Sequence, residues 1–295
     1  MGGGIWLNTQ RPEWNDGNNA LVGSGVSFVT LCYLQRYTQF LKTILASCPQ
    51  QIDLTDAVGD WLIKTSGILK DILIQRQDKP VNPAQRFKSL KALGQAASVY
   101  RAEVYQAEAL EKSVFARSSI DALIDSALTI FKQTITDNQR DDGLFQTYNL
   151  LKTESEQTSI SPLYPMLEGQ VAILSAKTLT PLESIKVLDA LFLSDIYRPD
   201  QDTFMLYPDR ALTDFLDKNR FSAASAAGDD LIQKMLAAKD QRLLIKDPNG
   251  DLRFHPDCTN IDALTERLNS VIKDYALEQP QSALDAMQNR FESVF

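Results

Sequence analysis

Four long amphipathic patterns in the first half of the chain restrict its fold most strongly. Within each pattern, apolar residues recur at intervals of three and four positions, the period of one face of a helix. The four segments are 26–48, 54–73, 83–104 and 120–135. Pro49 and Lys79-Pro80 end the first two, and Pro83 opens the third, where a first-turn proline is favoured. No strand pattern is evident between them, so the sequence predicts antiparallel helix pairs and a mainly all-α fold.

The second half predicts shorter helices and a little β-structure. Helical patterns are expected at 163–177, from 181 to 192, at 261–275 and at 280–295. Thr180 to Glu183 has the residue order of a capping box with a first-turn proline. Residues 204–207 are predicted to be extended. Asp247 to Asp251, with glycine at position 250, predicts the turn of a β-hairpin near 243–254. The polar stretch 153–159 is predicted to be a long loop.

Length and composition indicate a globular chain. With 295 residues, of which 44% are hydrophobic and 23% charged, the chain can bury a large core. No convincing linker interrupts it. The sequence therefore predicts a single helical domain over 1–295, with a loop-rich insertion carrying minor β-structure at 197–258.

Charge and cysteine content restrict the partners and the compartment. The formal net charge is −8 and the basic residues are scattered, so nucleic acid is not expected as a partner. Cys32, Cys48 and Cys258 are odd in number and lack metal-like spacing, which indicates free thiols in a reducing compartment. The chain shows no charged leader and no apolar run of about 18 residues. We therefore expect no membrane contact and a cytoplasmic location, provided that the printed N-terminus is the natural one.

The segment from Arg11 to Leu21 contains the densest group of side chains that could bind or cleave a substrate. It contains two carboxylates, an indole and several amides, contributed by Glu13, Trp14, Asn15, Asp16 and Asn18 among others. Such groups can stack a sugar ring, hydrogen-bond its hydroxyls and protonate a glycosidic oxygen. The same residues also form turns and cap helices, and the residue types alone leave both roles open.

Trp14-Asn15-Asp16 resembles a segment of the six-hairpin, or (α/α)6-toroid, carbohydrate-active enzymes, and is closest to their cellobiose-phosphorylase-like and uncharacterised glycosidase-like branch. Further similar stretches are 142–144, 148–151, 161–170, 197–201 and 205–210. Three departures matter. The phosphorylase segment usually begins with Asp where this chain has Glu13, no phosphate-binding residues can be matched, and the family's chains extend beyond both ends of this one.

The resemblance implies an incomplete (α/α)6 toroid, because the chain has fewer helical patterns than six hairpins require. The chain would then be an internal to C-terminal fragment, partnered by the missing hairpins of a longer protein or by a second copy. An independent helical domain that shares loops with the family is the alternative.

The function that the resemblance implies is acid-assisted, inverting cleavage of a glycosidic bond in an oligosaccharide or glucan-like substrate. Asp16 would be the general acid and Trp14 the sugar platform. The enzyme would be a glycoside hydrolase or a disaccharide-phosphorylase-like enzyme. It would need no metal and no cofactor, with inorganic phosphate as the co-substrate of a phosphorylase. A non-catalytic helical scaffold that binds carbohydrate or a partner chain is the alternative.

Glu168 is the second candidate for a catalytic carboxylate. It follows Leu167 in an otherwise apolar helix, and apolar surroundings favour the neutral form of a carboxyl group. In an inverting hydrolase such a group activates water and lies roughly 6.5–9.5 Å from the acid. Glu168 can equally pair with an arginine or cap a backbone end. Gly169 beside it predicts the close approach of another group.

The remaining candidates would recognise sugar hydroxyls. They are Glu13, Asn15, Asn18, Tyr148, Asn149, Gln170, Arg198, Asp200, Asp209 and Arg210. For the residues beside Pro199 and Pro208, turn formation is an equally good explanation. The single histidine, His255, argues against a Ser-His-Asp mechanism and is expected to be a hairpin residue rather than a metal ligand.

Overall fold

The computed structural model describes residues 2–8, 21–76, 81–107, 109–209, 213–215, 217–275, 277 and 279–294. The chain divides into two compact units, Met1–Asp209 and Arg210–Phe295. We call them the N-terminal and C-terminal units and describe each by itself. The boundary between the two units lies inside residues 197–258, which the sequence predicted to be a loop-rich insertion. The expectation of a single domain over 1–295 stays a prediction.

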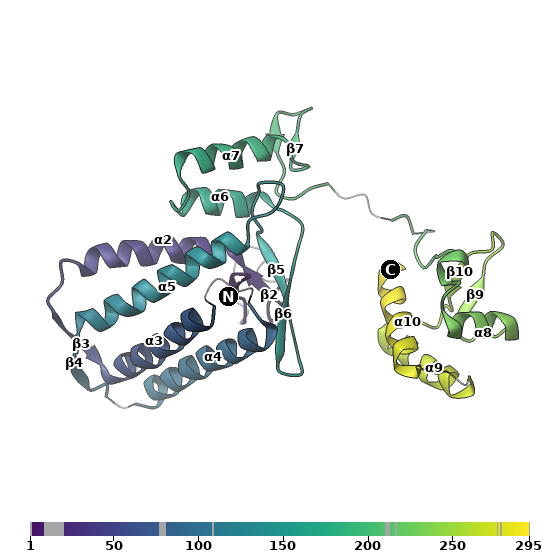
Figure 1. Cartoon of the computed structure of the whole chain (residues 1–295), viewed down its shortest axis with the longest axis horizontal. Helices are drawn as coiled ribbons and strands as arrows, with labels where there is room; N and C mark the ends of the chain where they lie inside the picture. The colour runs from purple at the N-terminus through teal and green to yellow at the C-terminus, as the bar shows by residue number, and fades with distance from the viewer. Residues whose placement is uncertain are drawn as a thin grey trace. The chain divides into compact units, whose positions relative to one another are not determined.

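Four long helices form a layer in the N-terminal unit (Figure 1). They are α2 (Phe28–Leu45), α3 (Asp56–Arg76), α4 (Pro83–Gln106) and α5 (Arg117–Asp137). Contacts place them side by side in the order α2, α5, α3, α4. Within the layer α2 runs antiparallel to α5, and α3 runs antiparallel to α4. The predicted helices are therefore present, and the mainly helical character of the chain is confirmed.

The helix starts follow local sequence signals. The side chain of Ser27 accepts a hydrogen bond from the backbone of Thr30, and Asn82 caps α4 just before Pro83. Helix α7 (Pro181–Phe192) begins with the predicted capping box, in which Thr180 and Glu183 satisfy each other's backbone N–H groups. Helix α6 (Leu167–Ser175) is shorter than the predicted helix over 163–177.

The expectation that no strands separate the four long helices was wrong. Strand β3 (Gln51–Thr55) lies between α2 and α3, and β4 (Lys112–Ala116) lies between α4 and α5. The two strands pair antiparallel along their whole length and tie one end of the helix layer together. Strand β3 does alternate polar and apolar residues, but it has only five residues, and β4 shows no such alternation.

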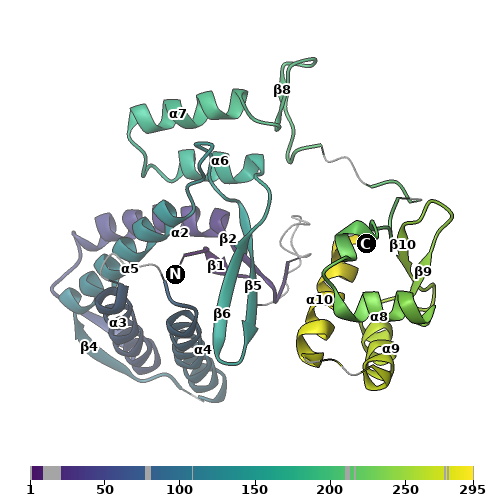
Figure 2. The same ribbon diagram turned by 45° about the vertical axis from the view of Figure 1, so that its right-hand side comes forward.

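A four-stranded antiparallel sheet lies at the other end of the layer (Figure 2). Its order is β1 (Ile5–Trp6), β2 (Gly25–Ser27), β5 (Tyr148–Glu154) and β6 (Gln157–Pro162). The predicted loop at 153–159 was wrong, because these residues form the end of the β5–β6 hairpin. Its two turn residues, Ser155 and Glu156, have φ of 47° and 60°, as a tight hairpin turn requires.

The core of this unit joins the start of α2 to α5, α6 and α7. Its buried members are Phe28, Leu31, Cys32, Ile135, Phe145, Ala172, Ile173, Ala176 and Val187. The rings of Phe28 and Phe145 stack with centroids 5.8 Å apart. After α7 the chain forms a short hairpin of β7 (Tyr197–Arg198) and β8 (Thr203–Phe204). The extended segment predicted at 204–207 is therefore a strand only at its first residue.

The C-terminal unit confirms the predicted hairpin and both predicted helices. Strands β9 (Leu244–Lys246) and β10 (Leu252–Phe254) pair antiparallel, and Gly250 has φ of 91° in the turn. Helices α9 (Ile261–Asp274) and α10 (Pro280–Val294) follow. The sequence had not indicated α8 (Asp230–Ala238), whose N-cap is Asp229. The unit buries its own apolar cluster, which includes Leu231, Phe254, Leu268 and Phe291.

The three cysteines are unpaired, as predicted, with Cys32 and Cys258 buried and Cys48 half-buried. Burial raises the pKa of the Cys32 thiol to about 12. In the part of the chain that the structure describes, no helix is both long and apolar enough to cross a membrane.

Candidate functional site

Glu168 and Tyr148, two of the predicted site residues, lie in direct contact. Glu168 is half-buried in the first turn of α6, and its Oε2 accepts a hydrogen bond of 2.9 Å from the Tyr148 hydroxyl. Tyr148 is almost fully buried at the start of β5. A rigid strand therefore holds the phenol, and the phenol fixes the orientation of the carboxylate.

Gln170 and Asn149 lie in the interior, where their amides bond to the protein itself. Gln170 accepts a hydrogen bond from the backbone N–H of Phe145 at 2.9 Å and donates to the Phe145 carbonyl at 2.7 Å. Asn149 donates to the carbonyl of Gly3 at 2.8 Å and to Asn138 at 3.0 Å. These bonds hold α6 and the first residues of the chain in place. A role for either amide in substrate binding stays a prediction.

The predicted close approach of another group to Gly169 is confirmed. A Cβ atom there would lie 2.8 Å from the carbonyl oxygen of Gln146, and the backbone N–H of Gly169 donates to Thr147 Oγ1 at 3.2 Å. The approaching group is the chain's own segment before β5. The glycine therefore lets α6 pack against this backbone and brings Glu168 within reach of Tyr148.

Arg198 and Asp200 form a separate pair on the exposed β7–β8 hairpin. Arg198 donates two parallel hydrogen bonds to the Asp200 carboxylate, at 2.8 and 2.7 Å. These bonds are the main reason that the pKa of Asp200 lies below its usual value and that of Arg198 lies above it. Asp209 is exposed at the end of the N-terminal unit and adds to the negative charge near Arg198.

Six predicted site residues lie outside the described residues. They are Glu13, Trp14, Asn15, Asp16, Asn18 and Arg210. The structure describes the residues on either side of segment 9–20, and hydrogen bonds join these two sides. Gly23 donates its backbone N–H to the carbonyl of Leu7 at 2.6 Å, and the Trp6 indole donates to the Gly23 carbonyl at 3.1 Å.

A cleft of about 1080 Å³ lies beside this tie, between α4 and residues of the four-stranded sheet and its flanks. Trp6, Asn8 and Gly23 line it from one side together with Leu151 and Thr153 of β5. Helix α4 lines the other side with Phe87, Leu90, Lys91, Gly94, Gln95, Ala97, Ser98, Val99 and Arg101. The sequence did not indicate this cleft, because its walls come from three distant segments and none of them carries a recognisable motif.

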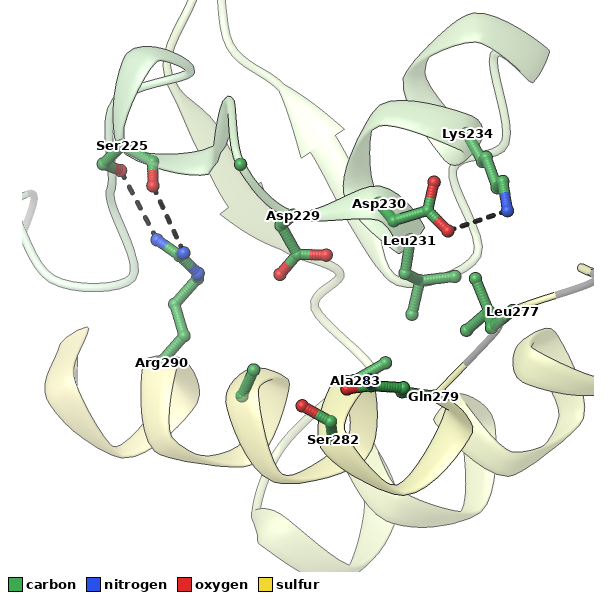
Figure 3. A pocket seen from close by; sticks show the side chains of 12 residues that line it. Ser225, Asp229, Asp230, Leu231, Lys234, Leu277, Gln279, Ser282, Ala283 and Arg290 are labelled. Carbon is green, nitrogen blue, oxygen red and sulfur yellow. Dashed lines mark hydrogen bonds and ion pairs between the residues drawn. The ribbon is translucent and has the colours of Figure 1, made fainter.

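The C-terminal unit has a second cleft, of about 720 Å³, between the start of α8 and α10 (Figure 3). On one side Arg290 donates to the hydroxyl and the carbonyl of Ser225 at 3.4 and 3.3 Å. On the other side Lys234 pairs with Asp230 at 2.7 Å. The carboxylate of Asp229 accepts a hydrogen bond from the backbone of Ile232 and caps α8.

His255 lies just after β10, as expected of a hairpin residue, and its Nδ1 accepts a hydrogen bond from the backbone of Asp257 at 3.2 Å. Among the described residues, no group of three or more His, Cys, Asp and Glu side chains is arranged to hold a metal ion.

Comparison with known proteins gives a family match for the C-terminal part of the chain. A comparison with curated proteins found no match to this chain. Residues 212–295, which make up nearly all of the C-terminal unit, match the family model described as GH149 phosphorylase insertion domain 2. The C-terminal part of the chain is therefore similar to an insertion domain of a phosphorylase family.

Proposed function

We propose that this chain is part of a carbohydrate-active, phosphorylase-like enzyme that cleaves a glycosidic bond with inversion at the anomeric carbon. The observation that carries the proposal is the match of residues 212–295 to a phosphorylase insertion domain. It is independent of Trp14-Asn15-Asp16, since the two lie at opposite ends of the sequence. Two separate parts of the chain thus favour the same class of enzyme.

In the proposed reaction Asp16 donates a proton to the glycosidic oxygen as the bond to the anomeric carbon breaks. Trp14 supports the sugar ring, and the polar residues around it bind hydroxyls. In hydrolysis Glu168 takes a proton from the attacking water, and its hydrogen bond from Tyr148 orients it for this role. In phosphorolysis inorganic phosphate attacks the anomeric carbon, so no second carboxylate base is required.

We further propose that the N-terminal unit is an incomplete (α/α)6 toroid, covered in the intact protein by further helical hairpins. Support comes from two exposed apolar stripes with helical spacing. On α2 the stripe is Tyr33, Tyr37, Phe40 and Ile44, and on α7 it is Leu182, Ile185, Leu188 and Phe192. Contiguous apolar faces of this kind usually mark an interface. The unpaired cysteines favour a cytoplasmic location.

A non-catalytic scaffold is the second candidate, and one observation favours it. Gln170 is fully buried and Asn149 nearly so, and both amides are engaged by the chain itself. These two residues, expected to bind a substrate, thus help to hold the fold together.

The central experiment is Asp16→Asn in the complete protein from which this chain comes. Asparagine keeps the shape of aspartate but has no proton to transfer, so activity should fall about 10²–10⁴-fold. Substrates with strongly acidic leaving groups should be affected much less, because their leaving oxygen needs little protonation. Asp125→Asn is a matched control, since this exposed residue of α5 pairs with Lys42. Full activity of Asp16→Asn on an ordinary glycoside would overturn the proposal and favour the scaffold.

Glu168→Gln distinguishes the two nucleophiles. If Glu168 activates water, this variant should lose hydrolysis; if phosphate attacks, phosphorolysis should be largely retained. Both activities are measured on one preparation, by the release of reducing sugar and of sugar phosphate. A thermal unfolding curve shows whether the altered contact with Tyr148 has changed the fold.

A further inference from the structure

The cleft along α4 is large enough to be a binding site. Its volume of about 1080 Å³ is slightly above the usual range for small-molecule sites, which is about 300–1,000 Å³, and leaves room for an extended ligand. The Trp6 indole is anchored by its hydrogen bond to the carbonyl of Gly23. A Cβ atom added at Gly23 or Gly94 would meet no atom within 4 Å, so the cleft is open at both positions.

Two aromatic side chains, Trp6 of β1 and Phe87 of α4, line this cleft. Both are half-buried, so each ring leaves part of its surface exposed. Exposed ring surface in a cleft can pack against the apolar faces of a ligand. Gln95 and Ser98 on α4 add an amide and a hydroxyl that can bind the hydroxyl groups of a sugar.

The described residues that line the cleft carry a charge opposite in sign to that of the chain. The formal net charge of the chain is −8, yet no Asp or Glu is among the described residues that line the cleft. Lys91 and Arg101 line it and are exposed, and neither forms an ion pair with a described residue. Lys91 lies 5.8 Å from the centre of the Phe87 ring, and Arg101 donates to the Ser98 hydroxyl at 3.2 Å. The described part of the lining, which has two cations and no carboxylate, attracts an anion.

The spacing of the two cations indicates an extended ligand. Lys91 and Arg101 are ten positions apart on α4, which corresponds to about 15 Å along a helix axis. This span is longer than one sugar residue, and Gln95 and Ser98 lie within it. We propose that the cleft between α4 and the four-stranded sheet binds an acidic oligosaccharide, with Lys91 and Arg101 as its charge partners. The proposal rests on the proposed function only in naming a saccharide as the ligand.

Titration calorimetry with the complete protein and three sugar tetramers tests the proposal. The probes are a galacturonic acid tetramer, a neutral glucose tetramer and the same glucose tetramer phosphorylated at one 6-hydroxyl. At least one of the two acidic tetramers should bind more tightly than the neutral one, and its identity shows whether carboxylate or phosphate is preferred. Its binding should weaken as salt is raised. Inorganic phosphate alone should bind weakly, because it cannot reach both cations or pack on the rings.

The double variant Lys91→Gln and Arg101→Gln should bind the preferred tetramer about five- to tenfold more weakly, whereas Lys88→Gln should bind it as the wild type does. Lys88 is the matched control, because it is an exposed residue of α4 that does not line the cleft. Asp16→Asn should bind the tetramer normally while losing activity, which separates this proposal from the proposed function. Equal binding of all tetramers, no saturable binding, or an equal effect of Lys88→Gln would overturn it.

Discussion

Asp240 shows how one residue can couple stability to pH in the C-terminal unit. Its carboxylate accepts hydrogen bonds from the Arg242 guanidinium at 2.7 to 3.1 Å and from the Tyr275 hydroxyl at 2.9 Å. Arg242 also binds Asp274 at the end of α9. The hydrogen bonds from Arg242 are the largest cause that lowers the pKa of Asp240, from 3.8 to about 2. This cluster joins the end of α8 to the end of α9.

We expect Asp240 to make the unit less stable in acid. Because its pKa is lower in the folded state, its contribution to stability is complete above about pH 4 and is lost as pH falls towards 2. Asp240→Asn should lower stability at pH 7 and reduce the loss between pH 4 and 2. Urea unfolding across this pH range, followed by circular dichroism, measures both effects. Glu292→Gln, at an exposed position of α10, is the control. An unchanged pH profile in Asp240→Asn would contradict the assignment.

Residue type alone predicted part of the candidate site. Tyr148 and Glu168 were both singled out, but their contact depends on the packing of α6 against the segment before β5, which one sequence does not show. An amide such as Gln170 has the same appearance in a sequence whether it faces a ligand or its own backbone. The cleft beside α4 was missed because Trp6 and Lys91 come together only through the fold.

At the scale of elements, the long helices and the β9–β10 hairpin were predicted well, whereas the short strands between the long helices, the β5–β6 hairpin and α8 were missed. The long stripes of α2 to α5 each span several turns, so their period is clear in the sequence. Strands β3 and β4 have five residues each, and neither contains a buried residue; the alternation in β3 is too short to stand out, and β4 has none. The β5–β6 turn uses Ser155 and Glu156 at positive φ, where Gly or Asn would have signalled a hairpin.

Gly169→Ala tests the contact that positions α6. The added methyl group would collide with the backbone of Gln146, so the variant should lose about 1–3 kcal/mol of unfolding free energy. Gly67→Ala is the matched control, since nothing lies within 4 Å of a Cβ atom at this helical glycine of α3. It should gain about 0.5–1 kcal/mol from helix propensity. Chemical denaturation measures both values, and equal changes in the two variants would show that the contact at Gly169 carries no strain.

For the molecule as a whole, the exposed stripes of α2 and α7 predict association. The chain as printed should self-associate and bind the dye 1-anilinonaphthalene-8-sulfonate, because apolar surface in contiguous patches avoids water. Replacing Tyr37 and Phe40 by glutamate should reduce both effects. Phe215→Glu should leave them unchanged, since we regard this exposed residue of the C-terminal unit as an isolated apolar side chain. A stable monomer in light scattering, without dye binding, would refute the prediction.

Because β3 pairs with β4, the α3–α4 hairpin begins and ends at neighbouring points of the fold. Gln50, just before β3, and Arg117, just after β4, are the two ends of this segment, and the backbone N–H of Arg117 donates to the Gln50 carbonyl at 2.8 Å. The length of the α3–α4 hairpin can therefore change without separating its two ends, as long as α3 keeps its contact with α5 and α4 keeps its contact with β6. Since α4 supplies one wall of the cleft, a change of sequence in this hairpin would change which ligands the cleft prefers. The hydrogen bond between Tyr148 of β5 and Glu168 of α6 does not involve this hairpin, so such a change would leave it in place.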